Sequence, residues 1–177
     1  MAGITVGVLA ADQVTKALVV DRRIPDGSSF GWVSVQVIRN HGGPGGIEYG
    51  SPILATLVVL ALTATVAVIM VRTTSRAVAL LLAAAIGGSL GNLSGRLFRS
   101  PGFGRGGVVD WIHFSGWNGS FDLADLALLF GALGALAVAW HVGEGRRREE
   151  RAMTPFRTVP PVVPPVARSL RHPIAGT

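Results

Sequence analysis

Apolar residues gather in four blocks along the chain, and polar or turn-forming residues separate the blocks. They cover about residues 1–20, 53–71, 77–97 and 121–142. A helix that crosses the hydrocarbon core of a bilayer needs roughly 20 consecutive apolar residues. The block at 53–71 approaches that length without a single charge. The pattern therefore predicts an all-α membrane protein in which residues 1–142 form one domain with four transmembrane helices.

The segments between and after the blocks differ in composition. Two glycine-rich loops lie at 21–51 and 98–120, and residues 32–38 within the first loop alternate in part, as a short strand does. The tail at 143–177 combines a run of arginine and glutamate with two Pro-Pro pairs. Proline interrupts helices and favours an extended, solvated chain. We therefore predict that the tail is disordered.

The arginines predict how the chain crosses the membrane. The formal net charge is +6, and many of the arginines follow the last apolar block. Short basic segments next to membrane spans remain in the cytoplasm. The turn at 72–76 and the tail are both basic, so we predict cytoplasmic termini and two long loops that face outward. The arginines carry no interleaved aromatic pattern, so nucleic acid is not an expected partner.

Several kinds of catalytic and metal site do not fit this chain. It has no cysteine, which rules out disulfides, thiolate metal sites and a cysteine nucleophile. His113 and His141 are too isolated in the sequence to support a serine triad. Histidine and carboxylate residues also lack the spacing of a metalloprotease helix. We expect no metal and no other cofactor.

The first apolar block contains two charges. Asp12 and Lys16 lie four residues apart, so they share one helix face and can pair. A charge near the centre of a bilayer costs about 2.5–3.5 kcal/mol on insertion scales, which makes such residues functional candidates. One interpretation is a neutralised ion pair that lets the helix insert. The other is that one of the two residues supports a polar site.

Three aspartates in the second half are candidates for acid–base chemistry. Asp122 and Asp125 share a helix face at the start of the fourth block, and Asp110 lies in the apolar frame of residues 108–112. Capping of the helix explains Asp122 well and Asp125 less well. Two carboxylates in a low dielectric cannot easily both ionise, so the pair holds one proton near neutral pH. Such a pair can activate water and protonate a carbonyl, which amide hydrolysis requires.

Five short motifs follow one another along the chain. They are Asp12-Gln13-Val14-Thr15-Lys16, Arg39-Asn40, Gly91-Asn92 with Arg96, Val108-Val109-Asp110-Trp111 and Phe121-Asp122-Leu123-Ala124-Asp125. In this order and at these separations, the chain resembles signal peptidase II, the lipoprotein signal peptidase family of bacteria. The resemblance covers about residues 8–140 and leaves out the tail.

The resemblance implies four transmembrane helices with a small extracytoplasmic β-cradle, in the bacterial cytoplasmic membrane. It implies an aspartic endopeptidase that removes signal peptides from diacylglyceryl-modified prolipoproteins by cutting before the lipidated cysteine. The partners are then these prolipoproteins and membrane lipid, and we expect a monomer with its active site at the outer face. The family's two catalytic aspartates fall on Asp110 and Asp125.

Further polar positions are implied to support the catalytic pair or to bind substrate. The family's supporting residues fall on four positions of this chain, and we add two neighbouring charged residues to them. The full set is Asp12, Lys16, Asn40, Asn92, Arg96 and Asp122.

Three departures from the family pattern leave alternatives open. Gly95 replaces an acidic residue and is expected to loosen the loop that positions Arg96. Asp122 replaces an asparagine and is expected to raise the pKa of Asp125 and the pH optimum. The turn at 40–46 lacks the family's phenylalanine. One alternative is therefore a non-catalytic relative that binds lipopeptide or an inhibitor. Another is a small transporter or scaffold with an Asp and Lys proton path, although a proton path would need acids spread through the membrane depth.

Overall fold

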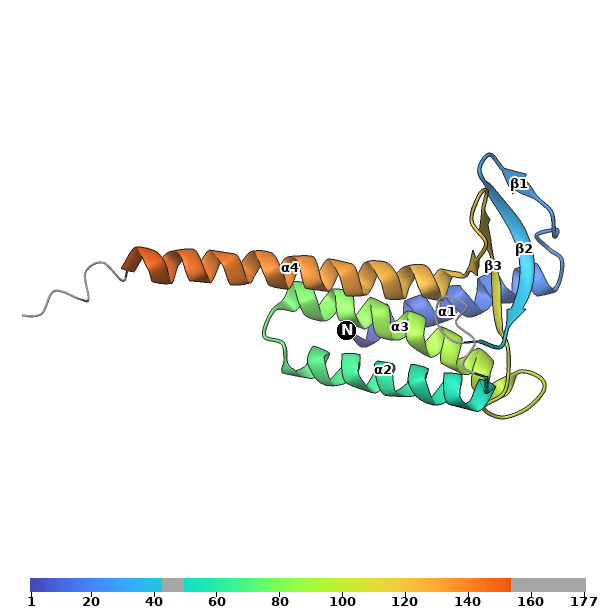
Figure 1. The fold of residues 1–177 in the computed structure, drawn as a ribbon, viewed down its shortest axis with the longest axis horizontal. Helices are drawn as coiled ribbons and strands as arrows, with labels where there is room; N and C mark the ends of the chain where they lie inside the picture. The colour runs from blue at the N-terminus through green and yellow to red at the C-terminus, as the bar shows by residue number, and fades with distance from the viewer. Residues whose placement is uncertain (43–49, 154–177) are drawn as a thin grey trace, which may run out of the picture. The chain divides into compact units, whose positions relative to one another are not determined.

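The computed structural model describes residues 1–42 and 50–153 and contains four long helices (Figure 1). The helices are α1 (Ala2–Val20), α2 (Pro52–Arg72), α3 (Arg76–Phe98) and α4 (Leu123–Met153). Within the described residues, all four are long and apolar enough to cross a membrane. The predicted membrane fold of four helices is therefore confirmed.

Local sequence signals account for several helix ends. Pro52 opens α2, at a position where its missing N–H group has no partner in the helix. Ser75 caps α3, and its hydroxyl oxygen accepts a hydrogen bond from the backbone N–H of Val78 at 3.4 Å. Arg72 and Arg96 lie in the last turns of α2 and α3, where a positive charge complements the helix dipole.

Helix α3 is the most buried of the four. In its apolar window 67% of the residues are buried, compared with 17%, 22% and 17% in α1, α2 and α4. Its glycines explain how its neighbours approach so closely. A Cβ atom on Gly87 would lie 2.7 Å from the carbonyl oxygen of Thr5, and one on Gly91 would lie 2.5 Å from Oδ2 of Asp12. Small residues thus let α1 pack directly on the α3 backbone, as they do between membrane helices generally.

A small antiparallel sheet lies at the end of the helices where α1 stops and α4 begins (Figure 1). Its strands are β1 (Ser29–Phe30), β2 (Val33–Asn40), β3 (Val108–Phe114) and β4 (Ser120–Phe121), in that spatial order. The predicted small sheet is therefore confirmed as part of the fold. Strand β2 starts one residue after the segment predicted from alternation and continues to Asn40.

The sheet is joined to α1 by a small apolar core. Val19 near the end of α1, Val35 on β2 and Val109 on β3 are almost fully buried and pack together. Trp111 of β3 and Val37 of β2 pack against them. This contact fixes β3, and therefore Asp110, next to the C-terminal end of α1.

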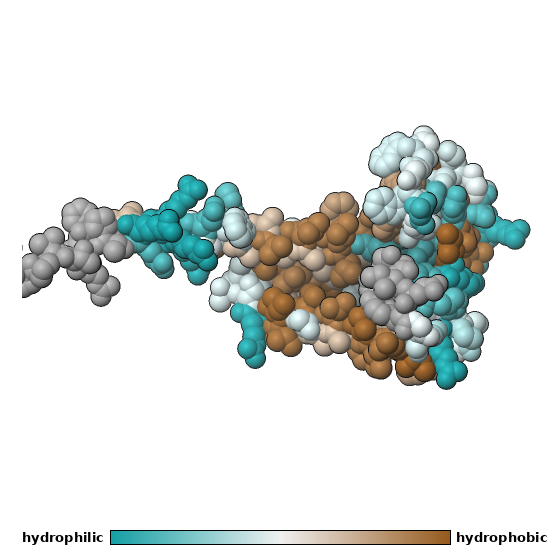
Figure 2. Space-filling model, in the orientation of Figure 1, coloured by the Kyte–Doolittle hydropathy of each residue, from teal (hydrophilic) through white to brown (hydrophobic). Residues whose placement is uncertain are grey.

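Large apolar side chains are exposed along the helices. Val6, Leu57 and Leu136 are 61%, 55% and 65% exposed. Figure 2 shows hydrophobic residues over the helices next to the sheet and more polar residues around the sheet itself. A surface this apolar is not stable in water and is typical of lipid contact.

The chain divides into two compact units, Met1–His141 and Val142–Thr177. Helix α4 continues to Met153, whereas we predicted a disordered tail from residue 143. The difference arises because residues 143–153 are rich in arginine and glutamate, which are good helix formers, and contain no proline. The proline-rich part of the predicted tail, residues 154–177, lies outside the described residues.

Candidate active site

Three aspartates from two parts of the fold meet at the sheet end of the helices. Asp110 is on β3, Asp122 directly precedes α4, and Asp125 lies in the first turn of α4. One carboxylate oxygen from each residue lies within 4.8 Å of the others. Asp110 is 3% exposed and Asp122 is 0% exposed. The structure thus brings Asp110 and Asp125 together, as the resemblance implies, and adds Asp122 to the cluster.

Strands β2 and β3 position Asp110. Asp110 pairs with Ile38 across the two strands, which places Asn40 diagonally next to it on the same face. The side-chain amide of Asn40 donates a hydrogen bond to Oδ2 of Asp110 at 3.1 Å. The amide oxygen of Asn40 accepts a bond from the N–H of Gly42 at 2.9 Å, which fixes the orientation of the donor. Asn40 therefore holds one oxygen of Asp110.

Asp122 and Asp125 form a reciprocal cap at the start of α4. Oδ1 of Asp122 accepts the backbone N–H of Asp125 at 2.7 Å, and Oδ2 of Asp125 accepts the backbone N–H of Asp122 at 3.4 Å. This is the pattern of a capping box, in which the first and fourth residues satisfy each other's N–H groups. The capping role predicted for Asp122 is thus present, and the cap also fixes the position of Asp125.

Lys16 connects the first and last helices through a buried ion-pair cluster. Its ammonium lies 2.8 Å from Oδ2 of Asp12 and 2.6 Å from Oδ2 of Asp122. All three side chains are at most 1% exposed. Asp12 also accepts the backbone N–H of Ala124 at 3.1 Å. The sequence left two interpretations of the Asp12 and Lys16 pair. The structure favours the one in which they support a polar site, because both residues bond to the start of α4.

Asn92 on α3 links this cluster to Asp125. Its amide oxygen accepts a hydrogen bond from the Lys16 ammonium at 2.8 Å, and its amide nitrogen donates to Oδ1 of Asp125 at 2.8 Å. The lysine can only donate, so it orients the amide with its NH₂ group toward the carboxylate. Both oxygens of Asp125 therefore receive an N–H donor.

Arg96 lies in the last turn of α3 and is 2% exposed. Its guanidinium donates to the carbonyl oxygen of Gly42, just after the strand that carries Asn40. The expected loosening of a loop by Gly95 is wrong, because Gly95 lies inside α3 and not in a loop. The nearest atom to a Cβ at Gly95 would be 3.5 Å away, so a Cβ atom there would make ordinary van der Waals contact. The altered turn at 40–46 lies partly outside the described residues.

The sequence analysis did not identify Gln13 or Gly91 as parts of the site. The amide of Gln13 donates to Oδ2 of Asp12 at 2.8 Å and to the carbonyl oxygen of Gly91 at 3.1 Å. A polar residue beside Asp12 in an apolar span was the available signal for Gln13. Nothing local in the sequence shows that Gly91 must make room for Asp12.

The site is electrostatically unfavourable for several ionised carboxylates. Burial raises the pKa of Asp110 to about 7, and the charges of Asp122 and Asp125 raise it as well, against the hydrogen bond from Asn40. Burial and the charge of Asp125 also raise the pKa of Asp122, against the attraction of Lys16. Asp110 can therefore hold a proton near neutral pH, as an acid catalyst must.

The three aspartates are the group in the described residues that could hold a metal ion. The Lys16 ammonium already lies 2.6 Å from Oδ2 of Asp122 and supplies a positive charge. A divalent cation at the cluster would meet electrostatic repulsion from that ammonium. The arrangement is therefore better suited to proton transfer than to metal binding.

Taken together, the fold and the site define a polytopic membrane protein with a cluster of three aspartates at one end of its helices. Comparison with known proteins identifies its family. Residues 4–141 match the sequence profile of signal peptidase (SPase) II. The chain therefore belongs to the signal peptidase II family and is an aspartic peptidase, as the motifs predicted.

Individual relatives agree with this assignment. The chain is 34% identical over 156 residues to the lipoprotein signal peptidase of Leifsonia xyli, a match that covers 85% of this chain and 72% of that protein. It is 37% identical over 133 residues to the lipoprotein signal peptidase of Rhodococcus jostii, with coverage of 71% and 65%. The solved structure of a bacterial membrane enzyme superposes with a TM-score of 0.64 at 22% identity, covering 78% of this chain and 85% of that one. That structural likeness supports the fold.

Proposed function

We propose that Asp110 and Asp125 are the catalytic pair with which this signal peptidase II hydrolyses its substrates. The observation that carries the proposal is their convergence, because two carboxylates from β3 and α4 lie within 4.8 Å in a largely buried site. The substrates are prolipoproteins, in keeping with the relatives that this chain matches. We further propose that the modified form is diacylglyceryl-linked and that the cut precedes the lipidated cysteine.

The geometry supports activation of one water molecule between the two carboxylates. A water that makes hydrogen bonds of about 2.8 Å to both partners can bridge oxygens that lie 4–5 Å apart. Oδ1 of Asp110 is buried and receives no hydrogen bond from the described residues, so it can still accept one from a bound water or substrate. Both oxygens of Asp125 receive N–H donors, which favour the ionised form of a carboxylate. We therefore assign the shared proton of the resting pair to Asp110.

The first step forms a bond between the water oxygen and the scissile carbonyl carbon. Asp125 accepts a proton from the water, and Asp110 donates its proton to the carbonyl oxygen. The product is a neutral diol. In the second step Asp110 takes back a proton from one hydroxyl while Asp125 donates its proton to the amide nitrogen. The carbon–nitrogen bond then breaks, and both residues return to their starting states.

Cleavage of a diacylated prolipoprotein by the purified enzyme tests this assignment. Variants that lack either member of the pair should bind substrate without releasing a signal peptide. The non-catalytic alternative rested on Gly95 and on the turn at 40–46. Gly95 lies inside α3 and the three aspartates still converge, so nothing in the described residues favours that alternative. We also propose that a monomer is sufficient, because every residue assigned here belongs to one chain.

We propose that the termini are cytoplasmic and that the site lies at the outer face, on the basis of the arginines at 72–76 and 146–151. The chain has no cysteine, so single cysteines report its orientation without background. In intact cells, a membrane-impermeant maleimide should label Ser115→Cys beside the sheet and should leave Thr74→Cys unlabelled. The opposite labelling pattern would reverse the topology.

The Asp122→Asn variant should shift the pH profile of the enzyme to lower pH. The charge of Asp122 raises the pKa of Asp110, so its removal lowers that pKa from about 7. Asp110 then loses its proton at a lower pH, and activity at alkaline pH falls earlier. We expect a shift on the order of one pH unit. Measurement of kcat/KM against pH for both enzymes checks this, and superimposable profiles would contradict a role for Asp122 in tuning the pair.

A further inference from the structure

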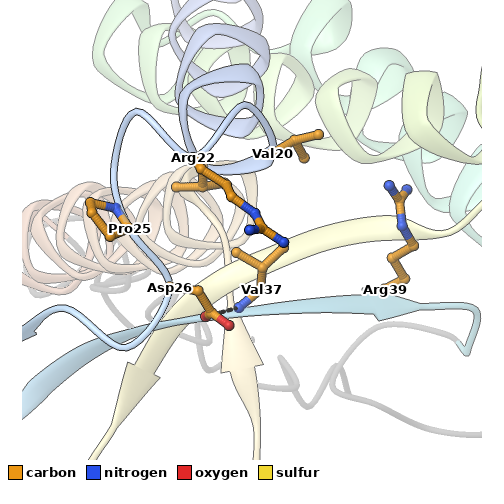
Figure 3. Close-up of a pocket in the computed structure, with 7 residues that line it drawn as sticks. Val20, Arg22, Pro25, Asp26, Val37 and Arg39 are labelled. Atoms are coloured by element: carbon orange, nitrogen blue, oxygen red, sulfur yellow. Dashed lines mark hydrogen bonds between the residues drawn. The ribbon is translucent and has the colours of Figure 1, made fainter.

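A pocket lies beside the sheet, on the side of β2 where α1 ends (Figure 3). Its volume is about 490 Å³. Val19 and Val20, the last two residues of α1, line it together with Val37 of β2. Because α1 is one of the membrane-spanning helices, the pocket lies at the boundary between the bilayer and the polar sheet. It is distinct from the aspartate cluster.

Two arginines give this pocket its charge. Figure 3 shows Arg22 extending from the end of α1 toward Val37, while Arg39 projects from β2. Within the described residues, neither guanidinium forms an ion pair or a hydrogen bond. Asp26 also lines the pocket. Its Oδ1 accepts the backbone N–H of Val37 at 3.1 Å, and this bond stabilises the loop after α1 against β2. The charged residues of the pocket therefore sum to one net positive charge.

The backbone of Arg22 is unusual for such a large residue. Its φ is 55°, in the left-handed region, and it is the one non-glycine residue with a positive φ in the described chain. The N–H groups of Arg22 and Arg23 donate to the carbonyl oxygens of Val19 and Leu18 at 3.2 and 2.9 Å. This is the Schellman pattern at the end of a helix, in which glycine normally occupies the position of Arg22. An arginine here strains the backbone, so the cap alone does not explain its presence.

We propose that this pocket binds the phosphate headgroup of an anionic phospholipid. Guanidinium groups bind phosphate through paired N–H donors, and two of them are available here. Val20 is 42% exposed and lines the pocket together with Val37, so these two side chains are suited to the glycerol and upper acyl segments of a lipid. Basic pockets beside membrane helices are known to take headgroups in this way. The inference does not depend on the assignment of the catalytic pair.

The test is thermal unfolding of the purified full-length protein in neutral detergent, with phosphatidylglycerol or phosphatidylcholine added. A ligand that binds only the folded state raises Tm. Phosphatidylglycerol should raise Tm of the wild type by several degrees, whereas phosphatidylcholine should not. Arg22→Gly should unfold at the same or a higher temperature without lipid, because glycine relieves the strained cap. It should nevertheless lose more than half of the shift caused by phosphatidylglycerol.

The controls separate the pocket from general surface charge. Arg39→Gln should lose the shift as Arg22→Gly does. Arg23→Gln removes the same charge from the neighbouring residue, which does not line the pocket, and should keep the shift. A full shift in Arg22→Gly, or an equal loss in Arg23→Gln, would overturn the proposal. An equal shift with inorganic phosphate at the same concentration would show an anion site and overturn the assignment to lipid.

Discussion

Asp110→Asn and Asp125→Asn are each expected to reduce cleavage of a prolipoprotein by about 10²–10⁴-fold or more. Asparagine preserves the shape of each side chain but can neither accept a proton from water nor carry one to the carbonyl. The expected loss lies in kcat, since each substitution removes proton transfer and leaves the shape of the side chain nearly unchanged. Single-turnover cleavage, with substrate binding measured separately, distinguishes the chemical step from binding.

The catalytic assignment also predicts how the two substitutions combine. Because the two aspartates act on the same water, the double variant should be hardly less active than either single variant. Asp21→Asn, at an exposed position after α1, is the matched control and should retain wild-type activity. Thermal unfolding should show that both catalytic variants remain folded. A folded Asp110→Asn or Asp125→Asn enzyme with more than about a tenth of the wild-type rate would reject the proposed pair.

Lys16→Met is expected to destabilise the folded protein by about 3–5 kcal/mol. The ammonium neutralises Asp12 and Asp122, whose side chains are fully buried. Without it, two carboxylates remain in a low dielectric, and the amide of Asn92 loses the donor that orients it. Denaturation in detergent and the yield of folded protein measure the effect.

Two comparisons test the role of Lys16. One is a double-mutant cycle with Asp122, and the other is an exposed ion pair on α4. Asp122→Asn should recover part of the loss in the Lys16→Met background, because it removes one of the two orphaned charges. Arg148 pairs with Glu144 at the same helical spacing, but at 3.9 Å and with 83% and 48% exposure. Arg148→Met should therefore change stability by less than about 0.5–1 kcal/mol. A wild-type Tm for Lys16→Met would contradict the view that this cluster supports the fold.

The helices were predictable because the signal for a membrane span is local. An uninterrupted apolar block such as 53–71 carries the information within itself, and the helix found there begins and ends within one residue of the block. The end of α4 was not predictable in the same way. Residues 143–153 read as a polar tail, yet arginine and glutamate also favour helix, and composition alone does not decide between the two.

The proposed catalytic pairing follows from the sequence only through the family motifs. Helical spacing alone points to Asp122 and Asp125, which share a face, whereas the proposed pair joins Asp125 to Asp110 on a strand. The second partner of Lys16 was not predicted at all. Asp122 is far from Lys16 in sequence, and only the packing of α1 and α4 on the glycines of α3 brings them to 2.6 Å.

The strain at Arg22 also lay beyond the sequence. Nothing in the residues that follow α1 shows which of them takes the left-handed conformation that ends the helix. Glycine usually occupies the left-handed position at the end of a helix. The nearest glycine after α1 is Gly27, which adopts a positive φ further along the loop. The pocket therefore depends on a backbone angle and on side chains from two elements, which no local sequence pattern encodes.

The polar network around Lys16 has a consequence for how the enzyme matures. Lys16 comes from α1, Asn92 from α3 and Asp125 from α4, and each is bonded to the next. No pair of adjacent helices contains the whole set. A nascent chain with only its first three helices in the bilayer lacks Asp125, which is one member of the proposed catalytic pair. If that pair is correct, we expect peptidase activity to appear only after α4 has inserted.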